Sequence, residues 1–197
     1  MLNFSERGAT STAGGFRLFF DDLRHHLQSL SIKVSAGCGK RGENVTIETV
    51  RVFMSEKAPD VAIIETTRST ATVALAAAAH GVEPERIAKT LSLRVGGRNL
   101  LLVVRGDARL DNRKLKAVFG GKAKLLQAEE VLAITGHPIG GVCPFGLKGP
   151  LPVYCDISIR AFDEIVPAAG STQSAVRINP LRMAKLVEAE WVDVIQD

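Results

Sequence analysis

One stretch, TGHPIGGVCPFGLKGPLPVYCD (Thr135 to Asp156), gathers many of the residues whose types could do chemistry. It carries one histidine and two cysteines among several glycines and prolines. Glycine permits backbone conformations that other residues avoid and proline fixes φ, so together they specify a shaped loop. Such a loop presents backbone N–H and C=O groups at short range, which suits a polar ligand. A loop that only connects a helix to a strand is equally consistent with this composition.

His137 and Cys143 are the side chains of this stretch with the most chemistry. A histidine can act as a general base or donate a hydrogen bond to a substrate, and it can equally satisfy loop carbonyls. Cysteine beside histidine can form a nucleophilic pair, but no local signature of a thiol hydrolase surrounds Cys143, which favours a small buried residue. Cys143, Cys155 and His137 contain no C-x-x-C pair and no fourth ligand is evident, so we expect no metal.

Lys89 lies among apolar residues in the segment ERIAKTLSLRV. It either extends to the surface along its apolar stem or is held in a cleft as a fixed positive charge, and the pattern alone favours the surface. A run of basic side chains follows, which we interpret as a solvated, mixed-charge face unless an RNA partner is established otherwise. These residues are Arg94, Arg98, Arg105, Arg109, Arg113, Lys114 and Lys116.

The composition is that of an ordinary globular chain. Its 197 residues are 46% hydrophobic and 23% charged, with a formal net charge of +4. That length suits one domain with a buried core. Three widely spaced cysteines argue against a disulfide framework and fit a reducing compartment, so the predicted location is the cytoplasm. No apolar run is long enough to cross a bilayer, so we expect no membrane partner.

The first 44 residues read differently from the rest, being rich in glycine, serine and threonine around one amphipathic patch, Phe16 to Leu30. We interpret residues 1–44 as an N-terminal extension, flexible or partly helical, and residues 45–197 as the main domain.

Short helices and strands intermingle after residue 45. The pattern predicts helices over 48–57, 69–79, 84–88, 111–119, 128–135 and 180–189, with Ser69 or Thr70 capping the second. It predicts strands over 61–64, 91–95, 99–104, 153–157, 164–167, 174–178 and 191–195, with Gly96-Gly97 turning a hairpin. No strict strand–helix–strand rhythm is present. The sequence therefore predicts an α+β fold, with a mixed, largely antiparallel curved β-sheet surrounded by short helices.

Several ordered motifs at compatible spacing resemble one protein family. They are IAKTL (87–91), RGDARLDNRKLK (105–116), TGHPIGGVCPFG (135–146), LPVYCD (151–156) and GSTQSAVRI (170–178). From about Val45 onward the chain resembles the YbaK/ProX family, the free-standing relatives of the editing domain of bacterial prolyl-tRNA synthetase. The resemblance implies that domain's fold.

The activity implied by the resemblance is that of a trans-editing aminoacyl-tRNA deacylase, which hydrolyses the ester between a wrong amino acid and the terminal adenosine of a tRNA. Lys89 inherits the position of the family's functional lysine, and His137 and Asp156 fall at matching positions beside the pocket. The family's G-x-x-x-P loop maps onto Gly140, Gly141, Val142, Cys143 and Pro144. Phe145 and Ser174 complete the expected substrate-binding residues. The resemblance implies no metal and no cofactor, with the substrate's own ribose hydroxyl assisting the water.

The substrate amino acid and the partners stay open at this point. Alanine, cysteine, serine and threonine are all candidates, and we expect Val142, Phe145 and Leu147 to form an apolar floor that suits a small side chain. The expected partners are mischarged tRNA and an aminoacyl-tRNA synthetase, with the protein a monomer or homodimer. One alternative is a non-catalytic tRNA-binding or synthetase-associated module. Another is a thiol-dependent hydrolase that uses Cys143.

Overall fold

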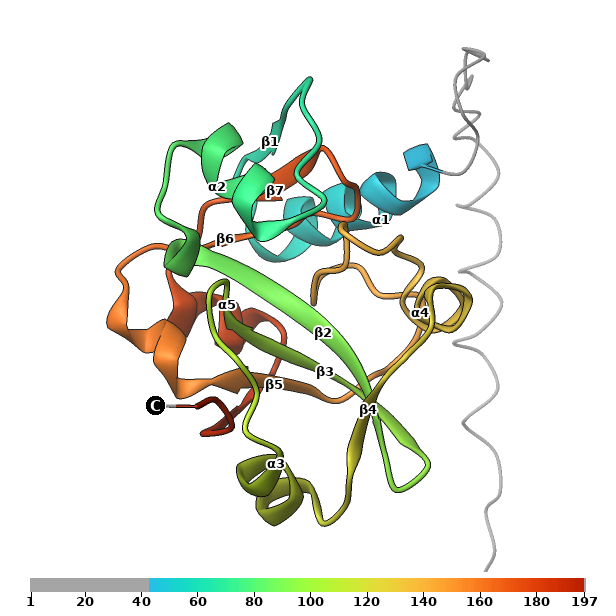
Figure 1. Ribbon diagram of the computed structural model, residues 1–197. Helices are drawn as coiled ribbons and strands as arrows, with labels where there is room; N and C mark the ends of the chain where they lie inside the picture. The colour runs from blue at the N-terminus through green and yellow to red at the C-terminus, as the bar shows by residue number, and fades with distance from the viewer. Residues whose placement is uncertain (1–42, 197) are drawn as a thin grey trace, which may run out of the picture. The chain divides into compact units, whose positions relative to one another are not determined.

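The computed structural model describes residues 43–196 of the chain (Figure 1). The amphipathic patch Phe16 to Leu30 and almost all of the predicted extension lie outside these residues, so the domain boundary stays a prediction. Within the described part the chain forms five α-helices: α1 (Glu43–Lys57), α2 (Val73–His80), α3 (Asn112–Phe119), α4 (Ala128–Thr135) and α5 (Pro180–Leu186). None of these helices is both long and apolar enough to span a membrane.

A mixed sheet of six strands forms the centre of the domain. Its order is β4 (Ala123–Leu125), β2 (Ile87–Val95), β3 (Arg98–Arg105), β5 (Val153–Asp156) and β8 (Glu190–Val192), with β6 (Val166–Pro167) beside the start of β2. The β2–β3 hairpin and the β2–β4 pair are antiparallel, whereas β6, β5 and β8 join in parallel. A second, two-stranded sheet pairs β1 (Ile63–Glu65) with β7 (Ser174–Val176) in antiparallel fashion. The predicted α+β fold is confirmed.

Both faces of the central sheet are covered, and the middle of β3, residues 100–104, is buried as a result. Leu101 and Val103 on one face pack with side chains of α1 and α5, while Leu100, Leu102 and Val104 on the other pack with α3. A strand that is buried on both faces reads as a continuous apolar run, which explains the segment NLLLVV. Figure 1 shows α3 below the hairpin and α2 above the start of β2.

The hairpin turn and two of the helices match the prediction. Gly96 and Gly97 turn the hairpin with φ of 55° and 81°, values that glycine adopts readily. The helices over 112–119 and 128–135 begin and end within one residue of the prediction.

Four element predictions are corrected. The helix predicted over 69–79 begins at Val73, because Thr72 caps it by accepting from the N–H of Leu75. Thr70 instead donates to the carbonyl of Thr172 (2.9 Å) and ties the preceding segment to the approach to β7. The segment over 84–88 makes a single 3₁₀ turn (Pro84–Arg86), and β2 starts at Ile87, where β6 supplies a parallel partner.

The other two corrections concern α1 and β4. The first helix starts at Glu43, five residues before its predicted start at Glu48. Strand β4, only three residues long, was not predicted, since the alternation in AKL is too short to indicate a strand. It pairs with the edge that β2 offers.

Candidate active site

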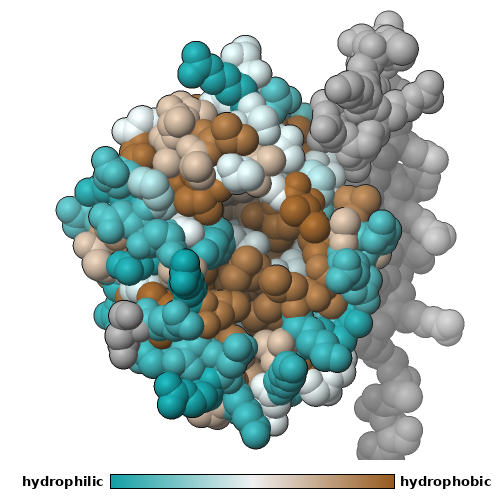
Figure 2. Space-filling view, viewed as in Figure 1, coloured by the Kyte–Doolittle hydropathy of each residue, from teal (hydrophilic) through white to brown (hydrophobic). Residues whose placement is uncertain are grey.

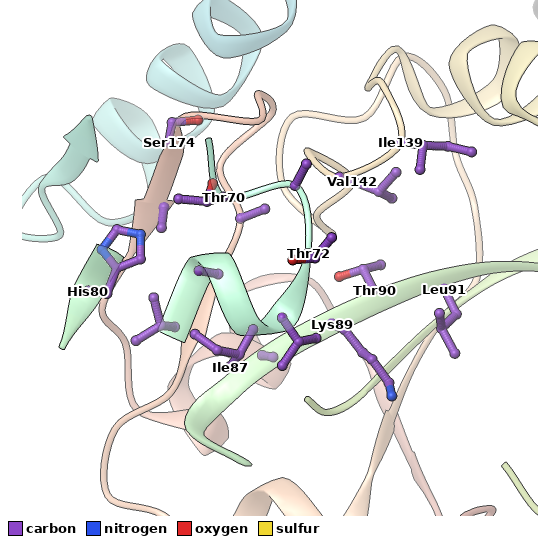
Figure 3. A pocket seen from close by; sticks show the side chains of 18 residues that line it. Thr70, Thr72, His80, Ile87, Lys89, Thr90, Leu91, Ile139, Val142 and Ser174 are labelled. Carbon is purple, nitrogen blue, oxygen red and sulfur yellow. The ribbon is translucent and has the colours of Figure 1, made fainter. Parts of the chain in front are cut away.

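A cavity of about 210 Å³ opens between α2, the start of β2 and the loop at residues 139–142. Figure 2 shows this face of the domain hollowed, with apolar residues around the hollow. Figure 3 shows the side chains that line it. They are Thr70, Ala71, Thr72, Val73, Ala76, His80, Ile87, Ala88, Lys89, Thr90, Leu91, Ile139, Gly140, Val142, Val166, Ala168, Ser174 and Ala175.

The glycine-rich loop can form this wall only because it lacks side chains at the points of contact. Gly140 has φ +85°, and a Cβ there would lie 2.9 Å from the Cα of Ala71. A Cβ on Gly141 would lie 2.7 Å from the backbone of Ser171. The Gly141 carbonyl also accepts from the N–H of Gly170 (3.1 Å). The loop is therefore fixed against the segment before α2 on one side and the segment before β7 on the other.

Lys89 lines the cavity but its ammonium is held at the edge. The Nζ atom donates to the carbonyls of Gly106 (2.9 Å) and Ala108 (2.6 Å), in the turn after β3. In Figure 3 the nitrogen lies away from Thr70 and Ser174. Burial lowers the pKa of Lys89, while the nearby carboxylate of Asp107 opposes this shift. The structure thus places Lys89 in a cleft as a fixed charge, rather than extended freely into solvent.

His137 lies behind the cavity wall, not in it. Its ring is completely buried, and Nδ1 accepts from the N–H of Cys143 (3.5 Å) and lies 3.7 Å from the Cys143 sulfur. Burial lowers the pKa of His137 to about 4, so the imidazole is neutral near pH 7. In this geometry the ring orders the loop from inside.

The residues after Gly141 divide between the cavity and the core. Val142 lines the cavity, whereas Cys143, Pro144 and Phe145 are buried behind it. Burial raises the pKa of Cys143 to about 12, so its thiol is protonated near pH 7 and poorly suited to act as a nucleophile. Phe145 packs against Phe53 of α1, with ring centroids 5.8 Å apart.

Asp156 is buried at the end of β5, where the backbone takes both of its carboxylate oxygens. Oδ1 accepts from the N–H of Ser158 (2.9 Å) and Oδ2 from the N–H of Val194 (2.8 Å). It therefore caps the following 3₁₀ turn (Ile157–Ala161) and anchors the C-terminal segment. It does not line the cavity.

Comparison with known proteins finds a family match over the region of the chain that forms the cavity. Residues 67–186, more than half of the sequence, match the family described as the aminoacyl-tRNA editing domain. The chain belongs to this family. Both walls of the cavity lie within the matched residues, as do β2 and the glycine-rich loop.

Individual proteins that are similar to this chain support the same family assignment. The chain is 41% identical to YwhH of Bacillus subtilis over 78% of its own length and 99% of that protein. It is 28% identical to EbsC of Enterococcus faecalis, provisionally named a Cys-tRNA(Pro)/Cys-tRNA(Cys) deacylase, over 58% of this chain and 71% of that one. A crystal structure provisionally described as a trans-editing enzyme for prolyl tRNA synthetase superposes with TM-score 0.72 and 30% identity. That match covers 77% of this chain and 98% of the other.

These findings confirm the predicted family and fold, and the activity class that comes with them. Editing domains act on aminoacyl-tRNA, so the predicted hydrolase class is confirmed at the level of the family. Which side chains do the work is a separate question, and the assignment of individual site residues stays a prediction.

The cavity brings together only part of the predicted set. Lys89, Gly140, Val142 and Ser174 line it, while His137, Gly141, Cys143, Pro144, Phe145 and Asp156 support it from behind or lie elsewhere. Ser174 is itself satisfied, since its hydroxyl donates to the carbonyl of Ala169 (2.9 Å) and accepts from Ser171 (2.8 Å). The expected apolar floor keeps only Val142, because Leu147 lies against α1 with Phe53.

Sequence reasoning missed the wall that α2 provides. Its segment VALAAAAH reads as an ordinary alanine-rich helix, yet Ala76 and His80 line the cavity. Two lining side-chain atoms are buried without a hydrogen-bond partner among the described residues, His80 Nε2 and Thr90 Oγ1. Sequence alone does not predict whether a buried polar atom finds a hydrogen-bond partner, because this depends on which residues the fold places opposite it.

Proposed function

We propose that this editing domain is a trans-editing deacylase that hydrolyses the ester between a small amino acid and the terminal ribose of a mischarged tRNA, and that the cavity is where it does so. The observation that supports this most is the cavity itself. Its volume of about 210 Å³ gives room for a small aminoacyl group, and it lies between a fixed positive charge and a backbone loop. Water adds to the ester carbonyl, the ester bond breaks, and the free amino acid and the tRNA leave.

The two ends of the cavity differ, and the difference orients the substrate. The inner end is lined by the small or apolar residues Ala76, Ile87, Val166 and Ala175. The other end carries Lys89, Gly140 and Ile139, of which Ile139 is 57% exposed. We place the aminoacyl side chain at the inner end and the ribose and adenine at the open end.

The loop offers donors for the ester carbonyl. The N–H groups of Gly140 and Val142 make no hydrogen bond to any residue that the structure describes, whereas the N–H of Gly141 donates to the carbonyl of Pro138 (2.9 Å). Backbone donors aimed at an oxygen that gains negative charge lower the barrier of acyl transfer, since they need no reorganisation. We assign this role to Gly140 and Val142.

Lys89 supplies the only formal charge on the cavity wall that the structure describes. An ammonium has three donors, and two of them are occupied by the carbonyls of Gly106 and Ala108. The third can reach a phosphate or hydroxyl of the terminal nucleotide. Among the described residues no carboxylate or thiol lines this cavity, and its one histidine, His80, lies at the inner end, away from the position proposed for the ester. This supports assistance by the adjacent ribose hydroxyl of the substrate.

The proposed partners are mischarged tRNA and the synthetase that produces it. The structural relative described as acting for prolyl tRNA synthetase points to tRNA(Pro) as the first substrate to test. We propose a cytoplasmic location, where such a substrate is made, and a protein that works as a monomer or homodimer.

Deacylation of a panel of charged tRNAs tests this function. The panel is tRNA(Pro) carrying alanine or cysteine, together with seryl- and threonyl-tRNA, assayed with excess enzyme. We expect hydrolysis of at least one species, and a loss on the order of 10²-fold or more in Lys89→Ala, because a charge held at the reacting end contributes several kcal/mol.

Two further variants make the test specific. Lys89→Arg keeps the charge but changes its shape, so its activity should lie between those of the wild type and Lys89→Ala. Lys124→Ala removes an exposed charge outside the cavity and should leave the rate unchanged. Salt-sensitive tRNA binding without hydrolysis of any species would instead indicate the non-catalytic binding module.

A further inference from the structure

The inner end of the cavity contains one polar group that its apolar lining does not explain. His80, the last residue of α2, is 9% exposed and lines the cavity beside Ala76 and Ala175. Its Nε2 atom is buried and has no hydrogen-bond partner among the described residues. A buried polar atom without a partner is destabilising, so such an atom in a binding cavity indicates a ligand group that pairs with it.

The fold holds this histidine in place through its backbone. The His80 carbonyl accepts from Arg177 Nη2 (2.7 Å), and Gly81 ends the helix immediately afterwards in the left-handed conformation. Burial lowers the pKa of His80, and the positive charge of Arg177 lowers it further. A neutral imidazole can donate at one nitrogen and accept at the other, so it can pair with a hydroxyl in either direction.

We infer that His80 is a specificity-determining residue, and that the preferred aminoacyl group carries a small hydroxyl side chain, serine or threonine, whose oxygen pairs with Nε2. This inference rests on the proposed function and narrows its substrate. Alanine would fill the same space but leave Nε2 unpaired. Cysteine would offer only a weak partner, since a thiol is a poor donor and acceptor.

The contrast with Thr90, the other cavity-lining residue with an unpaired side-chain atom, supports this assignment. Thr90 follows Lys89 directly and lies with it toward the open end of the cavity, near the position proposed for the ester (Figure 3). His80 lies at the opposite end, among the apolar side chains of α2, β6 and β7 (Figure 3). Only His80 is therefore placed to read the side chain of the amino acid.

The test compares seryl- and alanyl-tRNA(Pro) as substrates for the wild type, His80→Leu and His80→Gln. We expect the wild type to prefer the seryl substrate in kcat/KM. His80→Leu keeps the bulk without the nitrogen and should lose about 10- to 100-fold on the seryl substrate, with little loss on the alanyl one. His80→Gln retains a donor and an acceptor and should keep part of the preference.

The outcomes separate this inference from the function on which it rests. If charged tRNAs are hydrolysed and Lys89→Ala abolishes the reaction, but His80→Leu leaves the seryl-to-alanyl ratio unchanged, the role of His80 is wrong and the deacylase stands. If nothing is hydrolysed, binding of the stable 3′-seryl- and 3′-alanyl-amido analogues of adenosine decides. Tighter binding of the seryl analogue, lost in His80→Leu, supports the role of His80, and equal binding overturns it.

Discussion

The buried side of the glycine-rich loop and the cavity on its other side use similar residue types in different ways. Behind the loop, His137 and Cys143 contact each other in the core and meet no solvent. The Nε2 atoms of His137 and His80 both lack a hydrogen-bond partner among the described residues, but only His80 lines the cavity, where Lys89 also has a charge held by two carbonyls. The comparison shows that residue type does not identify a reactive group. What a side chain is buried against decides whether it orders the fold or faces a substrate.

The largest effect on the core side is expected for Phe145→Ala. Truncating a completely buried phenylalanine lowers the free energy of unfolding by about 3–5 kcal/mol. Because Phe145 does not line the cavity, the order of preference among charged tRNAs should stay the same in the folded fraction. Chemical denaturation and the tRNA panel measure the two effects, and Val142→Ala is the matched cavity variant. A changed substrate preference in Phe145→Ala but not in Val142→Ala would mean that the core side of the loop, rather than the cavity side, determines specificity.

The neutral state of His137 predicts a pH dependence of stability. Its pKa is lowered to about 4 in the folded protein, so between that value and the usual 6.5 the unfolded chain binds the proton more readily. Stability from this group is complete above about pH 6.5 and is lost as the pH falls, by roughly 3 kcal/mol at pH 4.

His137→Asn isolates this contribution, because asparagine can accept from the N–H of Cys143 but does not titrate. Denaturation at pH 7 and pH 4 should show a smaller loss in the variant than in the wild type. Equal losses would mean that the ring is protonated in the folded protein or that it is exposed.

Gly140→Ala tests the contact between the loop and the segment before α2. The alanine would have positive φ and a Cβ 2.9 Å from Ala71, so we expect a destabilisation of about 1–3 kcal/mol together with reduced deacylation. Gly97→Ala is the matched control, since its φ is +81° but its Cβ would meet nothing within 4 Å. Single-turnover rates should fall only in Gly140→Ala. A similar fall in both variants would point to global strain.

The smallest effect is expected for Cys143→Ala. Removing the buried sulfur leaves a small void and lowers stability by about 1 kcal/mol. The rate of deacylation should change little, because the thiol is fully buried and its pKa is raised to about 12. A loss as large as that of Lys89→Ala would restore the thiol-dependent alternative.

Local signals predicted much of the fold but little of the cavity. Gly96-Gly97 between two apolar runs predicted the hairpin, and Asp111 and Gly120 delimit α3 as caps do elsewhere. The start of β2 was placed too late because its first pairing is with β6, which lies far along the chain. The α2 wall was missed for a similar reason. The sequence of an alanine-rich helix with one histidine does not indicate which elements it faces. Here α2 faces β6 and β7.

The close approaches of the loop also limit how this domain can change. Side chains cannot be added at Gly140 or Gly141 without meeting backbone within 3 Å. The loop wall of the cavity therefore cannot change its shape through substitution of these glycines. The opposite wall is a short helix on which Val73, Ala76 and His80 project into the cavity, and exchanges there disturb no backbone contact of the loop. A laboratory selection for new amino acid specificity should therefore accumulate its substitutions on α2 and leave the loop as it is.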